Sequence, residues 1–206
     1  NILKILKIIL DNDDQLNNIC NESYHYMLFE KMVLLTGKKG WKLRLHLFNN
    51  NNVNGIQEQL HSHRNHFLSM CLNGSMTQKI WEIDNNSTSN DTNDSNTTSF
   101  YKYTYYPKPS SNNNNNNREY NIIRYKDKIV MKEVLEQTTN KGDMYYMHPS
   151  IIHQVNTCNN NTITLVLNSK NVTNKSCFIA DSIWHPDTLN RNKINKKELK
   201  SILNMI

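Results

Sequence analysis

HSHRNHFLSMCLNG, residues 61–74, sets two histidines two positions apart at the head of an apolar, strand-like run that ends in Asn-Gly. Residues two apart on a strand face the same side, so His61 and His63 are expected to project together and reach one ion. A third histidine, His153, stands in a second apolar run far downstream. The sequence therefore predicts a metal site formed by three imidazoles; the alternative is three unconnected structural histidines.

The runs around this stretch alternate with period two, which is typical of strands with two different faces. Residues 41–48, WKLRLHLF, put leucines on one face and basic side chains on the other. Asn73-Gly74 is a strong turn signal, so residues 67–72 and 76–81 are expected to pair as a hairpin. Further strands are expected at residues 101–106, 121–125, 129–135, 143–147, 151–155 and 162–167.

An N-terminal helix and a short C-terminal helix are expected to flank these strands. The pattern predicts an all-β sandwich or barrel. At 206 residues the chain is expected to form one domain, residues 1–206. Two Asn-rich tracts, residues 84–99 and 110–118, are too polar to bury a face and are expected to be disordered loop insertions.

Charge and composition argue against several partners. The net charge is +6, but the lysines are scattered and cluster only near the C-terminus, with no aromatic platform beside them, so nucleic acid is not expected. The opening NILKILKIIL is too short to span a bilayer, and Lys4 and Lys7 interrupt it at helical spacing. An amphipathic helix is expected there, with a signal-peptide core as the alternative, and no membrane partner.

The cysteines show no CxxC spacing, which argues against a disulfide framework or a zinc knuckle. Reduced thiols and a cytoplasmic location are therefore expected. They are Cys20, Cys71, Cys158 and Cys177.

Glycines stand at set distances from the histidines. Gly55 lies six residues before His61, Gly74 follows the second histidine by eleven, and Gly142 precedes His153 by eleven. These spacings resemble the two motifs of the cupin superfamily, G-x5-H-x-H with a closing glycine and G-x5-P-x-G-x2-H-x3-N. The resemblance implies a double-stranded β-helix, the cupin jelly-roll barrel.

The match departs from the family pattern at informative places. The glutamate that usually follows the second histidine by four residues is Phe67 here, and the proline of the second motif is His148. A three-histidine set without a carboxylate resembles cysteine dioxygenase and related thiol dioxygenases. A longer likeness, to a group of largely uncharacterised cupins, runs through SYHY (23–26), LRLH (43–46), residues 61–74, GDMYY (142–146), HQV (153–155) and TLVL (164–167).

This resemblance implies a divalent metal, with iron(II) favoured. Zinc(II) is the alternative, because imidazole ligands bind both metals. A non-haem iron dioxygenase-like oxidoreductase acting on a small anionic substrate, a thiol or an amino acid, is the leading hypothesis. A non-catalytic small-molecule-binding cupin and a zinc-dependent hydrolase or isomerase are the alternatives. A small-molecule substrate is the expected partner, and a homodimer is compatible with these expectations.

Three further residues are candidates for contact with substrate. Arg44 and His46 share one face of their strand, and a guanidinium there could clamp a carboxylate; alternation does not say whether this face meets solvent or the interior. Tyr145 and Tyr146 are adjacent, so one of them must point inward, and Tyr145 is the residue we select. His66 has the wrong parity for the metal site and is expected to face away.

Overall fold

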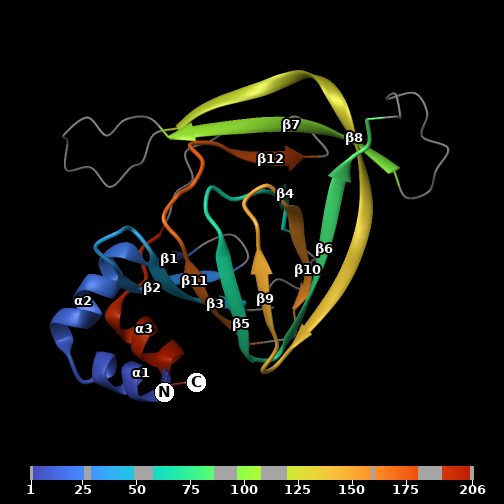
Figure 1. The fold of residues 1–206 in the computed structure, drawn as a ribbon. Coiled ribbons are helices and arrows are strands. Elements are labelled where there is room, and N and C mark those ends of the chain that lie inside the picture. The colour runs from blue at the N-terminus through green and yellow to red at the C-terminus, as the bar shows by residue number, and fades with distance from the viewer. Residues whose placement is uncertain are drawn as a thin grey trace.

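The computed structural model describes residues 2–25, 29–48, 58–85, 97–107, 120–158, 161–180 and 192–204. Figure 1 shows three helices gathered beside a β-barrel. The helices are α1 (Ile2–Leu10), α2 (Asp13–Glu22) and α3 (Lys196–Leu203). The strands are β1 (Tyr24–His25), β2 (Glu30–Thr36), β3 (Lys42–Phe48), β4 (Leu60–His61), β5 (Phe67–Asn73), β6 (Ser75–Ile83), β7 (Thr97–Pro107), β8 (Tyr120–Asn140), β9 (Met144–Met147), β10 (Ile152–Cys158), β11 (Thr162–Asn168) and β12 (Ser176–Ala180).

Eight of these strands pair as a nested antiparallel set. β3 pairs with β11, β4 with β10, β5 with β9, and β6 with β8. The set then folds over on itself, because β11 also pairs with β5 and β10 with β6. A nested hairpin wrapped in this way is a jelly roll, or double-stranded β-helix. The all-β jelly-roll prediction is confirmed by this pairing.

The remaining strands extend the two sheets. β1 and β2 lengthen the first sheet, whose order is β1-β2-β3-β11-β5-β9. β12 and β7 lie between β4 and β8, so the second group closes in the order β10-β4-β12-β7-β8-β6. Closure leaves this second group without a free edge. The short strand β4 is thereby held on both sides, by β10 and by β12.

The helices cover the outer face of the first sheet, as Figure 1 shows for the side that carries β1, β2 and β3. Leu45 and Leu47 of β3 are fully buried in this helix-facing core. The helical side of the same core contains Leu6, Ile9, Leu16, Ile19, Leu199, Ile202 and Leu203. Burial of each such side chain contributes about 1.5–3 kcal/mol. The outer face of β3 is therefore the apolar one.

The N-terminal segment forms two helices where the sequence predicted one. The side chain of Asn12 accepts a hydrogen bond from the backbone N–H of Gln15 at 3.0 Å, which caps α2 and separates it from α1. The predicted C-terminal helix is present as α3, and Asn195 and Glu198 form a capping box at its start. Within the described residues, no helix has the length and apolar character required to cross a membrane.

The predicted hairpin at Asn73-Gly74 is wrong. β5 and β6 follow each other directly but belong to different sheets, so the chain changes sheet at Gly74 instead of reversing beside itself. Gly74 has a φ of 73°, a left-handed conformation that glycine adopts without strain. The turn signal was therefore correct about local geometry and wrong about the pairing partner.

Other boundaries also differ from the prediction. The two strands expected at 121–125 and 129–135 are one strand, β8, and β7 begins at Thr97, inside the tract 84–99. Residues 86–96 and 108–119, which make up most of the predicted insertions, lie outside the described residues, as does Gly55. Strands β1, β2 and β12 were not predicted from the sequence, and β4 ends at His61, short of the strand expected to include His63.

The thiols whose side chains are described, those of Cys20, Cys71 and Cys177, are free, as expected. Burial raises the pKa of the Cys71 thiol, which keeps this thiol in its unreactive form.

Two glycines provide a matched test of the sheet crossing. Gly74 and Gly142 both have positive φ, but an added Cβ would approach Thr162 Oγ1 to 2.5 Å at Gly74 and would meet nothing within 4 Å at Gly142. Gly142→Ala should therefore cost only backbone strain, about 1–2 kcal/mol of unfolding free energy. Gly74→Ala should cost about 1–3 kcal/mol more because it also overpacks the crossing. Urea denaturation of both variants measures this, and equal losses would contradict it.

Candidate metal centre

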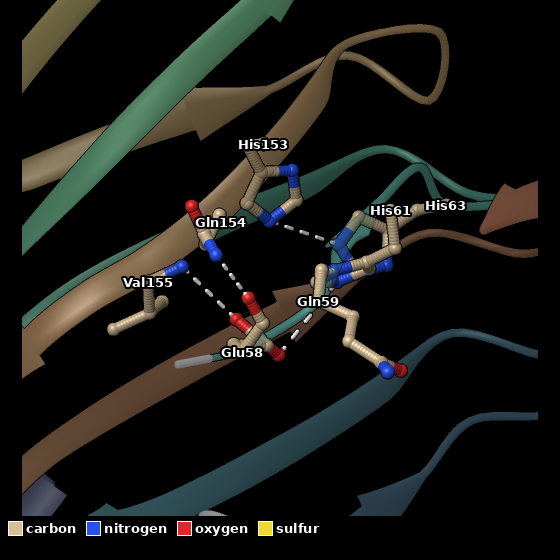
Figure 2. A network of polar contacts seen from close by, with 7 residues as sticks. All are labelled: Glu58, Gln59, His61, His63, His153, Gln154 and Val155. Atoms are coloured by element: carbon tan, nitrogen blue, oxygen red, sulfur yellow. Dashed lines mark hydrogen bonds and ion pairs between the residues drawn. The ribbon is translucent and has the colours of Figure 1, made fainter. Parts of the chain in front are cut away.

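The three predicted histidines converge in one place. One ligand nitrogen from each of His61, His63 and His153 lies within 4.8 Å of the others. The ring centroids are 4.6–4.9 Å apart, and Figure 2 shows the three imidazoles grouped beside β10. His66 is not a member of this group, as its parity predicted.

Strand register brings the distant histidines together. His153 on β10 is the direct antiparallel partner of His61 on β4, so two residues far apart in sequence become cross-strand neighbours. His61 is also paired to Phe178 of β12 on its other side. This double pairing fixes the direction of the His61 backbone.

His63 reaches the site in a different way from that predicted. β4 ends at His61, so the two histidines do not share one continuous strand. Beyond the strand, the N–H of Ser62 bonds to the Cys177 carbonyl at 3.0 Å, and the N–H of His63 bonds to the Pro149 carbonyl at 3.2 Å. Backbone contacts to strand β12 and to the turn between β9 and β10 therefore orient His63, where strand alternation had been expected to do so.

The nitrogens that face the site are the Nε2 atoms. Nδ1 of His61 lies 2.9 Å from the Gln59 carbonyl, so that nitrogen carries the proton and Nε2 has a free lone pair. Nε2 of His63 and Nε2 of His153 are 3.3 Å apart. Metal–nitrogen bonds of about 2.1 Å separate neighbouring ligand nitrogens by about 3.0–3.4 Å. The His63–His153 pair therefore already has the spacing of two donors to one ion, and the His61 nitrogen, within 4.8 Å of both, completes the group.

Electrostatics favour the ligating form of these side chains. Burial lowers the pKa of His63 well below its usual range, and the neighbouring His61 and His153 lower it further. Burial also lowers the pKa of His153 well below its usual range, and His61 adds to this effect. Metal ions bind the neutral imidazole, so neither side chain needs to lose a proton near pH 7 in order to bind.

An apolar wall stands on one side of the imidazoles. Phe67 occupies the position where the family pattern has a glutamate, and its ring lies edge-on to His63 with centroids 4.9 Å apart. Phe67 packs in a cluster with Met147 and Val166. Position 67 therefore provides shielding from water and no ligand.

Glu58 is the residue near the site that the sequence analysis missed. Its Oε1 lies 3.8 Å from Nε2 of His61, its Oε2 accepts the Val155 N–H at 3.1 Å, and its carbonyl accepts a hydrogen bond from Gln154 (Figure 2). The side chain is 11% exposed. Glu58 stands three residues before His61, at one of the unspecified positions between Gly55 and His61 in the family motif, so only a search for carboxylates close to the histidines in sequence could have found it.

Arg44 and His46 lie on the inner face of β3, because Leu45 and Leu47 occupy the helix-facing core. The ring of His46 packs against Phe29 and Phe48, with centroids 4.6 and 6.3 Å away. Lys31 is the cross-strand partner of His46 on β2. The charge of Lys31 contributes to the lowered pKa of His63, which places this face within electrostatic range of the metal centre.

The two adjacent tyrosines take opposite sides. Tyr145 is half-buried and packs edge-on to Phe67, with centroids 6.0 Å apart, so it is the inward residue. Tyr146 is 59% exposed and its hydroxyl hydrogen-bonds to Nδ1 of His66. The ring of His148 lies 4.9 Å from that of His66. His66, Tyr146 and His148 thus form a separate cluster that shares no member with the metal centre.

No protein-family model matches the sequence, and no curated protein matches it. Among solved structures, a variant of oxalate decarboxylase from Bacillus subtilis is similar with a TM-score of 0.39 and 10% identity, over 73% of this chain and 28% of that one. Oxalate decarboxylase from Lactobacillus farciminis, in a formate complex, gives 0.35 and 10%, over 73% and 31%. CapF with an inhibitor gives 0.39 and 9%, over 74% and 33%.

The chain spans about a third or less of the length of these structures. Superpositions this loose carry no argument about function. The jelly-roll assignment rests on the strand pairing, and the chemistry rests on the side chains described above.

Loss of a ligand should remove the metal. Protein purified without chelator should carry about one divalent ion per chain, and His153→Ala should reduce this to a small fraction because two imidazoles hold an ion poorly. His66→Ala is the matched control and should retain the wild-type content. Elemental analysis measures all three proteins. Equal metal in wild type and His153→Ala would contradict the site.

The buried His46 should make the chelator-treated protein sensitive to acid. Burial lowers the pKa of His46 well below its ordinary value of 6.5. Below that value the unfolded chain binds a proton at His46 that the folded chain does not. The contribution of His46 to the unfolding free energy is therefore complete above about pH 6.5 and is lost as the pH falls, which gives the unfolding free energy a slope against pH. His46→Phe should reduce this slope by up to about 1.4 kcal/mol per pH unit.

Urea denaturation at about pH 7.5 and about pH 5.5 measures that slope. His148→Gln, at an exposed position, serves as control and should leave the slope unchanged. An identical slope in His46→Phe and wild type would show that His46 is not the buried neutral group we describe.

Proposed function

We propose that this chain is a metal-binding cupin that oxidises a small anionic substrate, a thiol or an amino acid, in a non-haem iron(II) dioxygenase-like reaction. The observation that carries the proposal is the convergence of three imidazoles in one place, where burial lowers the pKa of both His63 and His153. Three neutral donors leave the full charge of a divalent ion directed at the remaining coordination positions, which favours anionic ligands. Bound iron(II) would supply a redox-active centre where substrate and dioxygen meet.

The residues of the chain would bind and orient the substrate. Arg44 on the inner face of β3 would hold a carboxylate in a bidentate contact, and Lys31 would add positive charge beside it. His46 stays neutral at physiological pH because burial lowers its pKa, so it would contribute a hydrogen bond and no charge. This basic face explains why an anionic substrate fits the proposal.

The β5–β9 end of the same sheet would exclude water. Phe67 on β5 packs beside the imidazoles, Tyr145 on β9 packs edge-on to Phe67, and both belong to the apolar cluster with Met147. A dry wall strengthens the contact between an anion and the basic face, because charges attract more strongly where water is absent. The Tyr145 hydroxyl would offer the substrate a hydrogen bond. The free thiols support a reducing compartment, in which iron(II) persists.

Oxygen-consumption screening of the iron-loaded protein tests the proposal. Small thiols, amino acids and 2-oxo acids form the panel, and turnover should stop under anaerobic conditions. Arg44→Gln should raise KM for the active anion about 10–150-fold, with a smaller change in kcat, because a charged hydrogen bond of about 1.5–3 kcal/mol is lost.

The control for this experiment is Arg64→Gln, which lies outside the inner face of β3 and should leave KM unchanged. Turnover that continues without oxygen, or with zinc alone, would favour a zinc hydrolase or isomerase. Metal binding without any turnover across the panel would favour a binding protein.

A further inference from the structure

One carboxylate oxygen of Glu58 lies 3.8 Å from Nε2 of His61, the nitrogen that would bind the metal. We propose that Glu58 is the fourth protein ligand of the ion, so that the centre holds three imidazoles and one carboxylate. This inference rests on the proposed metal-binding function. It replaces the expectation of a carboxylate-free centre, which followed from Phe67 alone.

The first argument concerns which atom Glu58 approaches. Nδ1 of His61 is taken by the Gln59 carbonyl, so Nε2 is the ligating nitrogen. Glu58 Oε1 lies 3.8 Å from that same Nε2. Two donors of one ion with bonds of about 2.1 Å lie no more than about 4.2 Å apart. The oxygen is therefore within reach of an ion bound to His61. A separation of 3.8 Å is too long for a hydrogen bond between Glu58 Oε1 and His61 Nε2, so this contact does not occupy either atom.

The second argument concerns how the carboxylate is held. Glu58 Oε2 accepts the N–H of Val155, two residues after His153, and the Glu58 carbonyl accepts a hydrogen bond from Gln154. These contacts fasten Glu58 to the strand that carries the third histidine, as Figure 2 shows. One oxygen is thus occupied by the backbone while the other is directed toward the imidazoles. Ligands whose remaining atoms are hydrogen-bonded in this way are pre-oriented for metal.

The third argument is one of charge. The side chain of Glu58 is 11% exposed, and buried carboxylates are rare unless a positive group balances them. The nearest basic group is His61, whose ring belongs to a cluster of imidazoles in which His63 and His153 favour the neutral form. A divalent ion supplies the missing charge. In this structure Glu58 Oε1 lies 3.8 Å from the ligating nitrogen of His61, which belongs to the group of three imidazoles, and ligation requires the side chain to turn toward an ion held by that group.

A carboxylate donor changes what the centre can bind. It lowers the charge on a divalent centre from +2 to +1 and adds a hard oxygen to three imidazoles, which moves the preference toward iron(II) and manganese(II). It also leaves one fewer position for substrate and oxygen. A small anion that binds through one or two atoms is then the substrate class that fits.

Cobalt(II) titration of the chelator-treated protein, followed by visible absorption and by competition with a chelator, tests the proposal without any turnover. Glu58→Gln is the decisive variant, because the amide oxygen can still accept the Val155 N–H while the charge is removed. We expect it to weaken cobalt binding by more than about 100-fold, beyond the 10–100-fold typical of outer-shell partners, and to shift the visible bands. Glu133→Gln, whose carboxylate bonds Lys79 elsewhere on the barrel, should change neither.

The outcomes separate the two proposals. Wild-type affinity and bands in Glu58→Gln would overturn the role of Glu58 and leave the three-histidine function standing. Weaker binding with unchanged bands would also overturn it, because Glu58 would then only position His61. A wild-type protein that binds no cobalt would overturn the proposed function itself.

Discussion

The metal centre depends on the pairing of a strand only two residues long. β4 lies between β10 and β12, and its register sets His61 directly across from His153. A shift of one residue would turn His61 to the other face, since strand side chains alternate. The nested pairing of the jelly roll excludes that shift, because β4 is closed into the barrel on both sides. Fold and site are therefore consequences of the same constraint.

The first sheet separates two environments with a single layer of backbone. One face of β3 carries leucines into the core beneath the helices, and the other carries Arg44 and His46 toward the interior between the sheets. Burial keeps His46, like His63 and His153, in the neutral form. The barrel thus holds a set of uncharged imidazoles, and its fixed positive charge comes from Lys31 and Arg44 on the same side. This arrangement suits an anion beside a metal ion.

Much of this could be predicted from period-two patterning and histidine spacing. The jelly roll and the three histidines follow from the spacing of histidines and glycines that resembles the family motifs, and the inward Tyr145 follows from alternation. The strand expected to carry both His61 and His63 ends at His61, and β12, which reads as a plain apolar run, was missed. The Asn73-Gly74 turn was assigned the wrong partner, because local turn chemistry does not say which sheet the next strand joins.

The carboxylate near the site escaped prediction for a different reason. The family pattern directs attention to position 67, and Glu58 occupies an unspecified position between Gly55 and His61, in a segment with no periodicity. Its place beside His61 arises from hydrogen bonds to Gln154 and Val155, which only the folded register brings near. His63 is similar, because backbone contacts to β12 and to the turn at Pro149 orient it after β4 has ended. Contacts of this kind join residues distant in sequence and leave no local signal.

Anomalous diffraction from crystals of the metal-loaded protein tests the central claim most directly. The account predicts one strong anomalous peak bonded to the Nε2 atoms of His61, His63 and His153. A peak at the His66 and His148 cluster instead, or imidazole rings of the three histidines directed to separate places, would contradict it.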